Sequence, residues 1–176
     1  MVDLVMLQVV RDLVAIFGVI AGLSYYVLTV RNSQKMQKTA LETRQAQFFM
    51  QIYSELSSKE FQHDHDNFIV NAEWDSYEDF MQKYGHRTGD GEIHDQGSHV
   101  ATYFEGVGLL VKRGLLDVSL VDDLMSSMVI RFWEKFRPLV LEMREAENMP
   151  QISEWLEYLY NRVRPLAEEQ HPELAT

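Results

Sequence analysis

Five side chains of the kinds that bind metal ions gather in one polar stretch of this 176-residue chain. The stretch is the loop from Gly85 to Ser98, GHRTGDGEIHDQGS, together with the residue that follows it. Carboxylate oxygens and imidazole nitrogens are common ligands of divalent cations. The candidate ligands are Asp90, Glu92, His94, Asp95 and His99. Because DGEIHD lacks the ligand order of an EF-hand loop, two interpretations remain open: a metal site of another geometry, or a solvated polar loop.

A second histidine-rich stretch, from His63 to Asp66, reads HDHD. On a helix, His63 and His65 point about 200° apart, so they are badly placed to bind one ion together. His65 instead shares a helix face with Phe61 and Phe68. The pattern therefore predicts a hydrogen-bonded histidine in the core at position 65.

The chain carries no recognised catalytic or phosphate-binding motif. It has no cysteine, no G-x-S-x-G, no P-loop, no H-E-x-x-H and no G-x-G-x-x-G. Several charged residues on the expected helices favour ion pairs between helices over a cationic ligand cleft; they are Glu105, Arg131, Glu134, Arg137, Arg144 and Glu157. We assign no catalytic residue and no cofactor, and the sequence favours a non-enzymatic role.

All of these residues follow an N-terminal segment with the character of a membrane span. No residue from Leu13 to Val30 is charged, and these 18 residues cover roughly 27 Å of helix, close to the hydrocarbon thickness of a bilayer. A cleaved signal peptide would have a basic start and a shorter apolar core, and a buried helix would have a polar stripe. We expect a transmembrane helix over about 12–30, within an N-terminal segment 1–30, with the lipid bilayer as its partner.

The charges after this span predict its orientation. Four basic residues and one acid follow it closely: Arg31, Lys35, Lys38, Arg44 and Glu42. Lysine and arginine concentrate on the cytoplasmic side of membrane proteins. The expected topology is a single pass through the inner (plasma) membrane, with the N-terminus outside and residues 31–176 in the cytoplasm. The absence of cysteine fits such a reducing compartment.

Within the span, Gly18 and Gly22 form a G-x-x-x-G spacing. Small residues at this spacing let two membrane helices approach closely. Self-association through these glycines is one interpretation, and a chance pair of glycines in a membrane helix is the other.

The rest of the chain shows the apolar spacing of helices and no strand alternation. We expect a basic juxtamembrane stalk helix over 31–58, an all-helical cytoplasmic domain over 59–165 and a tail over 166–176. Serines expected to begin helices are Ser57 or Ser58, Ser76, Ser98 and Ser119. Pro138 is expected to kink a helix or begin a new one, Pro150 to stand in the first turn of the last helix, and Pro165 and Pro172 to close the ordered part.

Glycines inside one expected helix predict close packing. Gly106 and Gly108 each cost about 1 kcal/mol of helix stability relative to alanine, so we expect them to contact another helix, the one that carries Trp133 or Phe136. Gly114 is expected to end their helix in the left-handed conformation.

The stretches YFEGVGLLVKRGLLDVSLVDDL, FWEKFRPLVLEMRE and EWLEYL, with WDSYEDFMQKYG upstream, carry a family resemblance. Over roughly Gln45 to Leu159 the chain resembles an uncharacterised bacterial family, the domain of unknown function number 4760. The resemblance implies an N-terminal membrane helix joined to an all-helical cytoplasmic region. It implies no activity and no catalytic residues.

Charge excludes one class of partner and completes the prediction. The net charge is −11, and residues 31–176 hold 15 basic and 25 acidic residues, so a nucleic-acid partner is disfavoured. The predicted fold is all-α, with one N-terminal transmembrane helix followed by a cytoplasmic multi-helix bundle. The predicted function is that of a membrane-anchored interaction or regulatory module. The alternative is a membrane-tethered metal-binding protein or enzyme that uses the loop 85–99.

Overall fold

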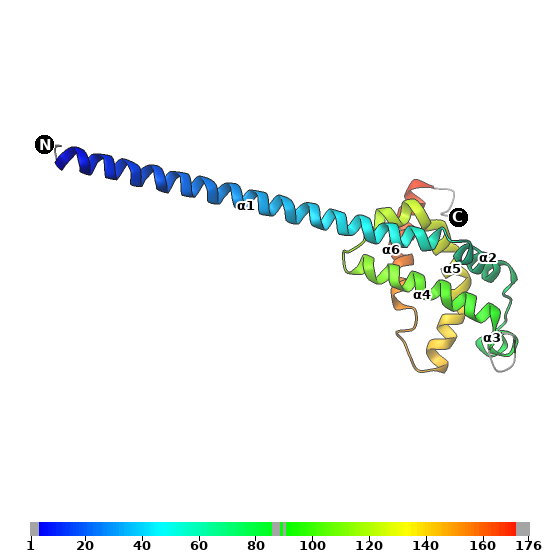
Figure 1. The fold of residues 1–176 in the computed structure, drawn as a ribbon. Helices are drawn as coiled ribbons and strands as arrows, with labels where there is room; N and C mark the ends of the chain where they lie inside the picture. The colour runs from blue at the N-terminus through cyan, green and yellow to red at the C-terminus, as the bar shows by residue number, and fades with distance from the viewer. Residues whose placement is uncertain (1–3, 86–88, 90, 172–176) are drawn as a thin grey trace. The chain divides into compact units, whose positions relative to one another are not determined.

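The computed structural model describes residues 4–85, 89 and 91–171, and within them the chain is all-helical with no strand (Figure 1). The chain divides into two compact units, Met1–Ala46 and Gln47–Thr176. The all-α prediction is confirmed. The helices are α1 (Leu4–Leu56), α2 (Lys59–Asn71), α3 (Tyr77–Tyr84), α4 (Glu92–Lys112), α5 (Val118–Ala146) and α6 (Glu154–Gln170).

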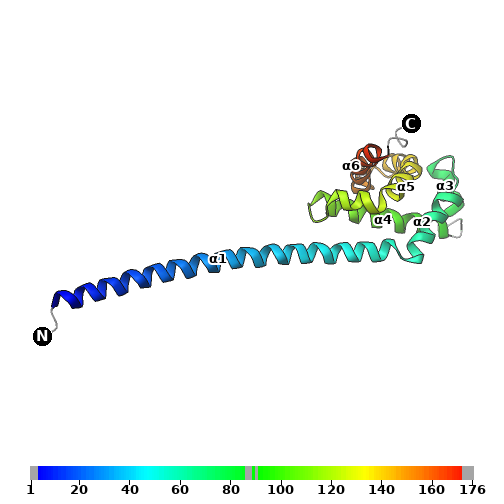
Figure 2. The same ribbon diagram turned by 90° about the horizontal axis from the view of Figure 1, so that it is seen from above.

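Among the described residues, the first unit contains only the greater part of α1, which runs without interruption from the apolar segment into the basic one (Figure 2). By length and composition α1 can cross a membrane, and none of its most apolar 18-residue window is buried. A helix in the core of a soluble protein would bury such a window. The candidate membrane span and the predicted stalk are therefore parts of one helix.

The last turns of α1 belong to the second unit and pack in its core. Ile52 and Leu56 are buried, and the Tyr103 hydroxyl on α4 donates a hydrogen bond to the Ile52 carbonyl over 2.7 Å. The segment 31–58, predicted as a stalk, is thus divided between an exposed part and a part that contributes to the hydrophobic core.

Side-chain caps fix the beginnings of α2 and α3 as predicted. The Ser58 hydroxyl accepts a hydrogen bond from the Phe61 amide, and the Ser76 hydroxyl accepts one from the Asp79 amide. The Asp79 carboxylate in turn accepts from the Asp75 amide, which completes a reciprocal arrangement like a capping box.

Three other predicted helix starts are wrong. Helix α4 begins at Glu92, not after Ser98, because Gly91 adopts φ 78° and Ile93 already packs in the core. Asp117, not Ser119, caps α5, since its carboxylate accepts from the Ser119 amide over 2.9 Å. The last helix begins at Glu154, beyond Pro150, because the backbone turns between them.

The two interior prolines do not end their helices. Pro138 lies inside α5 and Pro165 inside α6, where each removes one amide donor. The residues four positions earlier, Glu134 and Asn161, are exposed, so water can satisfy the carbonyls that lose a partner. Helix α6 consequently continues through Pro165 to Gln170, into the segment predicted as a tail, and Pro172 lies outside the described residues.

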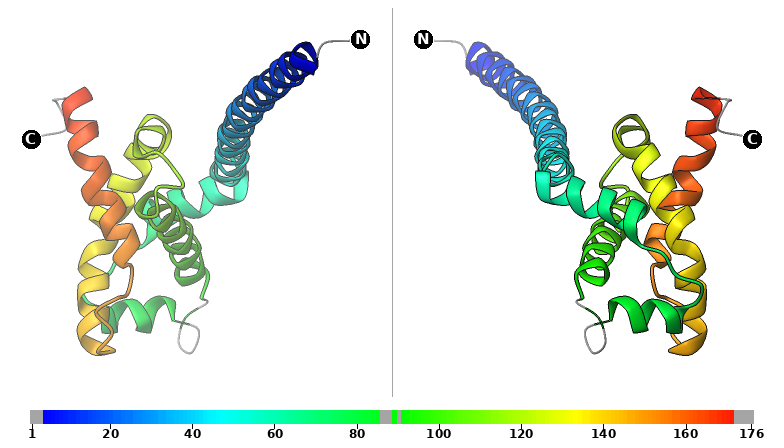
Figure 3. Two further views of the ribbon diagram at one scale, coloured as in Figure 1. Left: turned by 90° about the vertical axis from the view of Figure 1, so that its left-hand side faces the viewer. Right: turned by 90° about the vertical axis from the view of Figure 1, so that its right-hand side faces the viewer.

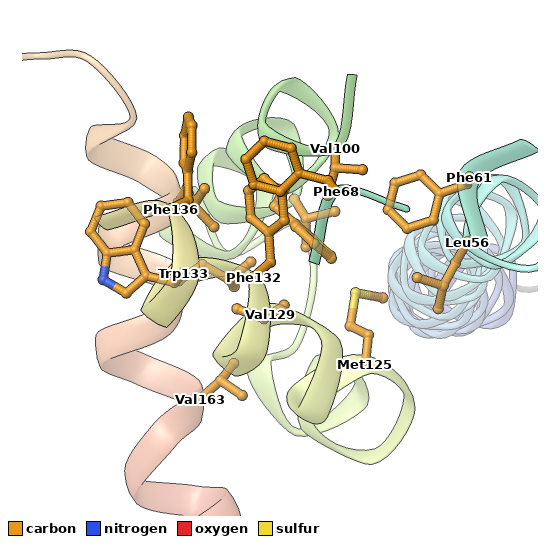
Figure 4. Close-up of a cluster of buried hydrophobic side chains, with 14 of the residues drawn as sticks. Leu56, Phe61, Phe68, Val100, Met125, Val129, Phe132, Trp133, Phe136 and Val163 are labelled. Atoms are coloured by element: carbon orange, nitrogen blue, oxygen red, sulfur yellow. The ribbon is translucent and has the colours of Figure 1, made fainter. Parts of the chain in front are cut away.

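The core of the second unit is a cluster of aromatic rings between α2, α4 and α5 (Figure 4). Phe132 is fully buried on α5, and its ring centroid lies 5.3 Å from that of Phe68, 5.9 Å from that of Phe104 and 5.2 Å from that of Phe136. Ring pairs at these separations add to the free energy gained by burying their apolar area.

Helix α6 lies beside α5 and also packs on α4 (Figure 3). Gly108 on α4 faces the first turn of α6, where an added Cβ would overlap the Trp155 carbonyl oxygen. An added Cβ at Gly106 would meet nothing within 4 Å. The predicted close helix contact therefore exists for Gly108 alone, and its partner is α6, not the helix of Trp133 and Phe136.

Gly114 ends α4 as predicted, at φ 67°. The Gly114 amide donates to the Val111 carbonyl over 3.0 Å, and the Leu115 amide donates to the Leu110 carbonyl over 2.9 Å. These are the two hydrogen bonds of a Schellman motif, which turns the chain toward α5.

Candidate functional site

Four of the five predicted metal ligands lie along α4 and do not converge; they are Glu92, His94, Asp95 and His99. Glu92 and Asp95 are exposed on its first turn, whereas His94 and His99 lie on different faces of the helix. Asp90 lies outside the described residues. Within the part of the chain that the structure describes, no group of three or more His, Asp or Glu side chains could hold a metal ion.

His94 faces a partly open cavity of about 150 Å3 between α2, α3, α4 and α5. Its ring centroid lies 6.1 Å from that of Phe80. The inner wall is formed by Phe68, Phe136 and Leu139, of which Phe68 and Phe136 are seen in Figure 4. Most of the lining is apolar, and this is the usual character of a small-molecule site.

Helix α3 forms one wall of the cavity and is held in place by polar contacts with α5. The Tyr77 amide donates to the Glu142 carboxylate over 2.6 Å, and the Tyr77 hydroxyl donates to the Glu147 carboxylate over 2.8 Å. Burial, and then the hydrogen bond to Glu147, raise the pKa of Tyr77. The phenol therefore remains a protonated donor at neutral pH.

His99, on another face of α4, stands between two carboxylates. Its Nδ1 lies 2.7 Å from Asp64 Oδ2 on α2, and its Nε2 lies 3.5 Å from Glu55 Oε1 on the last turns of α1. Only the doubly protonated ring can donate from both nitrogens. The hydrogen bond to Asp64 raises the pKa of His99 against the effect of burial, and Glu55 and Glu60 add to the increase.

Replacing His99 with glutamine is expected to change how stability depends on pH. The pKa of His99 is higher in the folded than in the unfolded chain, so its contribution is complete below about pH 6.5 and is lost as the pH rises through the folded pKa. The loss of unfolding free energy in His99→Gln should thus be greatest in acid and smallest in alkali. Urea unfolding of the full-length protein in detergent, from about pH 5.5 to 9, measures this.

The matched control is Asp64→Asn, which removes the largest cause of the raised pKa and keeps a polar side chain. Asp64→Asn should lose the same part of the pH dependence of unfolding free energy as His99→Gln. If wild type and His99→Gln gave parallel curves across the range, the ion pairs of His99 would contribute nothing.

His65 is the core histidine that the sequence predicts. Its side chain is 1% exposed, with Nε2 3.3 Å from the Met128 carbonyl and Nδ1 3.1 Å from Asp66. Its ring also lies against Phe132, 6.2 Å between centroids. These contacts make His65 a structural link between α2 and α5.

The predicted ion pairs between helices are present in part. Arg144 pairs with Glu157 over 2.8 Å and donates to the Ile152 carbonyl over 2.9 Å. Glu105 acts differently: its carboxylate accepts the Leu156 amide over 2.7 Å. Helix α6 has no side-chain cap of its own at Ser153, so Glu105 supplies the missing acceptor from α4.

Replacing Glu105 with alanine is expected to lower the free energy of unfolding by about 1–2 kcal/mol, because a helix loses its N-terminal acceptor. Glu105→Gln keeps an acceptor oxygen and should lose clearly less. Urea unfolding gives the free energies, and faster hydrogen exchange of the Leu156 amide locates the effect. Equal losses in the two variants would exclude the capping role.

A further open cleft, of about 600 Å3, borders Trp74 and was not expected from the sequence. The Lys135 ammonium lies 5.0 Å from the centre of the Trp74 ring. The cleft is also lined by Glu73, Asp75, Glu134 and Glu142, and by Lys83.

Glu147, at the smaller cavity, was also not expected from the sequence. Its partner Tyr77 is 70 positions away, and no sequence pattern joins the two residues.

Comparison with known proteins gives one result. No curated protein and no solved structure matches the chain significantly. The sequence model of one family, described as a domain of unknown function, DUF4760, matches residues 13–163, which is most of the chain. The match includes the apolar half of α1 as well as the helical domain, and the chain belongs to the DUF4760 family.

Proposed function

We propose that this protein is anchored in the inner membrane by a single pass of α1 and that its acidic helical domain acts in the cytoplasm as a regulatory or interaction module. The observation that carries the proposal is that none of the apolar window of α1 is buried. Large apolar side chains such as Leu13, Phe17 and Leu23 are about half exposed or more, and a bilayer would remove them from water. Arg31, Lys35, Lys38 and Arg44 support the cytoplasmic side for the domain.

The regulatory role is supported by two features of the domain. The cavity beside His94 offers an apolar site for a small ligand. The last turns of α1 also join the domain through Ile52, Leu56 and the contact between Glu55 and His99. The helix that carries the candidate anchor therefore ends in the same packed unit as the cavity, without an intervening loop.

Reporter fusions test the topology. An enzyme that is active only in the cytoplasm, fused after Thr176, should be active, and a reporter active only outside should be inactive at the same point. Replacing the four basic residues 31, 35, 38 and 44 with glutamine should weaken this orientation. An active external reporter on the wild-type chain, or a chain released by carbonate washing, would overturn the proposal.

Self-association through Gly18 and Gly22 is part of the same proposal. A Cβ added at either glycine would meet nothing within 4 Å, so the fold of a single chain does not require glycine there. Gly22→Leu is expected to abolish close pairing of two copies in membranes, measured by energy transfer between labelled chains. Ala21→Leu is the matched control on the adjacent face and should leave the transfer unchanged. Equal transfer in all three proteins would contradict pairing through the glycines.

A further inference from the structure

The cavity beside His94 has the size and walls of a site for one aromatic ring. Its volume of about 150 Å3 matches that of an engineered apolar protein cavity that binds benzene. Rings from three helices border it: Phe68 from α2, Phe80 from α3 and Phe136 from α5. The Phe68 and Phe136 rings meet edge to face, at 5.9 Å and 76°, a geometry that aromatic pairs favour.

Two methionines make the site adaptable. Met81 on α3 and Met143 on α5 both line the cavity. A thioether on a flexible side chain adjusts to the shape of a ligand and makes favourable contacts with aromatic rings. The lining therefore suits a flat aromatic molecule better than an aliphatic one of similar size.

Glu147 lines the cavity and is exposed, so it lies at the rim and restricts the charge of the ligand. Glu147 is the one acidic residue among the described residues that line the cavity, and it already holds the Tyr77 hydroxyl. A carboxylate can accept more than one hydrogen bond, so a ligand hydroxyl or N–H can also donate to Glu147. An anionic ligand would be repelled there, and a charged one of either sign would lose its hydration in the apolar interior.

We propose that this cavity binds a small uncharged aromatic molecule with one hydrogen-bond donor, of the phenol class. The ring lies between the phenylalanines and the methionines, and the donor points to Glu147 at the rim. The proposal supplies the ligand class for the regulatory role proposed above and rests on that role for its biological meaning. Its test does not involve topology, so a failed reporter fusion and a failed binding experiment are distinguishable results.

Phenol itself is the probe, added to the full-length protein in detergent with 13C-methyl-labelled methionine. The Met81 and Met143 methyl resonances, assigned from Met81→Leu and Met143→Leu, should shift and saturate with a Kd on the order of 1 mM or tighter. Met36 is exposed on α1 and far along the chain from the cavity, so its methyl reports non-specific partitioning. Shifts that fail to saturate, or that are equal at Met36, overturn the proposal.

Two comparison ligands test the chemistry. Benzoate has the same ring and a negative charge, and cyclohexanol has a hydroxyl without an aromatic ring. Both should bind at least about tenfold more weakly than phenol. Glu147→Gln should reduce the discrimination against benzoate and keep phenol binding. Equal affinity for phenol and benzoate in the wild type would overturn the proposed ligand class.

A variant that blocks the cavity completes the test. Ser98 lines the cavity but is exposed on α4, so Ser98→Phe can cover the opening without disturbing the core. The variant should keep its thermal unfolding temperature and lose the saturable shifts. Unchanged saturable shifts in a folded Ser98→Phe protein would show that phenol binds elsewhere.

Discussion

Replacement of Phe132 with alanine is expected to lower the free energy of unfolding of the helical domain by about 3–5 kcal/mol. Phe132 is fully buried, and its ring contacts rings from α2, α4 and α5, so truncation leaves a cavity that no single neighbour can fill. Because the domain's total stability is of the order of 5–15 kcal/mol, such a loss would leave a large part of the protein unfolded on mild heating.

Intrinsic fluorescence in urea measures this effect cleanly. The three tryptophans, Trp74, Trp133 and Trp155, all lie in the second unit, so their signal reports on the domain even when detergent surrounds α1. Leu120→Ala is the matched control, a truncation on the same helix at a side chain that is 40% exposed. It should cost less than about 1 kcal/mol. Similar losses in both variants would mean that the aromatic cluster is not the centre of the core.

The second large effect is that alanine substitutions at two glycines of α4 are expected to change the free energy of unfolding in opposite directions. Gly108→Ala is expected to destabilise the domain by about 1–3 kcal/mol, because the new methyl group overlaps the Trp155 carbonyl oxygen and forces α4 and α6 apart. Gly106→Ala is expected to stabilise it by about 0.5–1 kcal/mol, because alanine favours a helix and the added Cβ meets open space.

Thermal and urea unfolding of the two variants give both values under identical conditions. Both variants replace a glycine of α4 with alanine. An opposite sign of their stability changes therefore reports the packing of α6 on α4. Stabilisation in both variants would mean that the backbone of α6 at Trp155 does not lie against Gly108 of α4. Destabilisation in both would mean that position 106 has a contact in the membrane-anchored protein.

The presence of the helices and their apolar faces were predictable from the sequence. The elements against which those faces pack were not. The spacing of Tyr77, Phe80 and Met81 predicts α3 and its apolar face, and Ser76 predicts where it begins. Nothing in that spacing tells that the face borders a cavity, because the cavity depends on how far α3 stands from α5. That distance follows from contacts such as Tyr77 with Glu147, which join residues 70 positions apart.

The start of the helix that carries most of the candidate ligands was predicted wrongly for a local reason. Gly85 to Ser98 is rich in glycine, aspartate and histidine, which are typical of loops, and the sequence therefore predicts a loop there. Ile93, Gln96 and Gly97 are buried, and α4 accordingly begins at Glu92, inside this stretch. Because His94 and His99 both lie on α4, they point in different directions, since five residues correspond to about 500° of helix rotation. Tertiary burial overrode local propensity here.

One turn of α4 holds the start of α6 from two sides, through the Glu105 carboxylate on the Leu156 amide and the bare backbone of Gly108 under the Trp155 carbonyl. Helix α6 lacks a cap from its own sequence, so its first turn becomes favourable only after α4 has formed. We therefore expect α4 to form before α6 during folding, and α6 not to fold as an autonomous unit. In native-state fluctuations α6 should open as one cooperative segment while the aromatic cluster of α2, α4 and α5 stays closed.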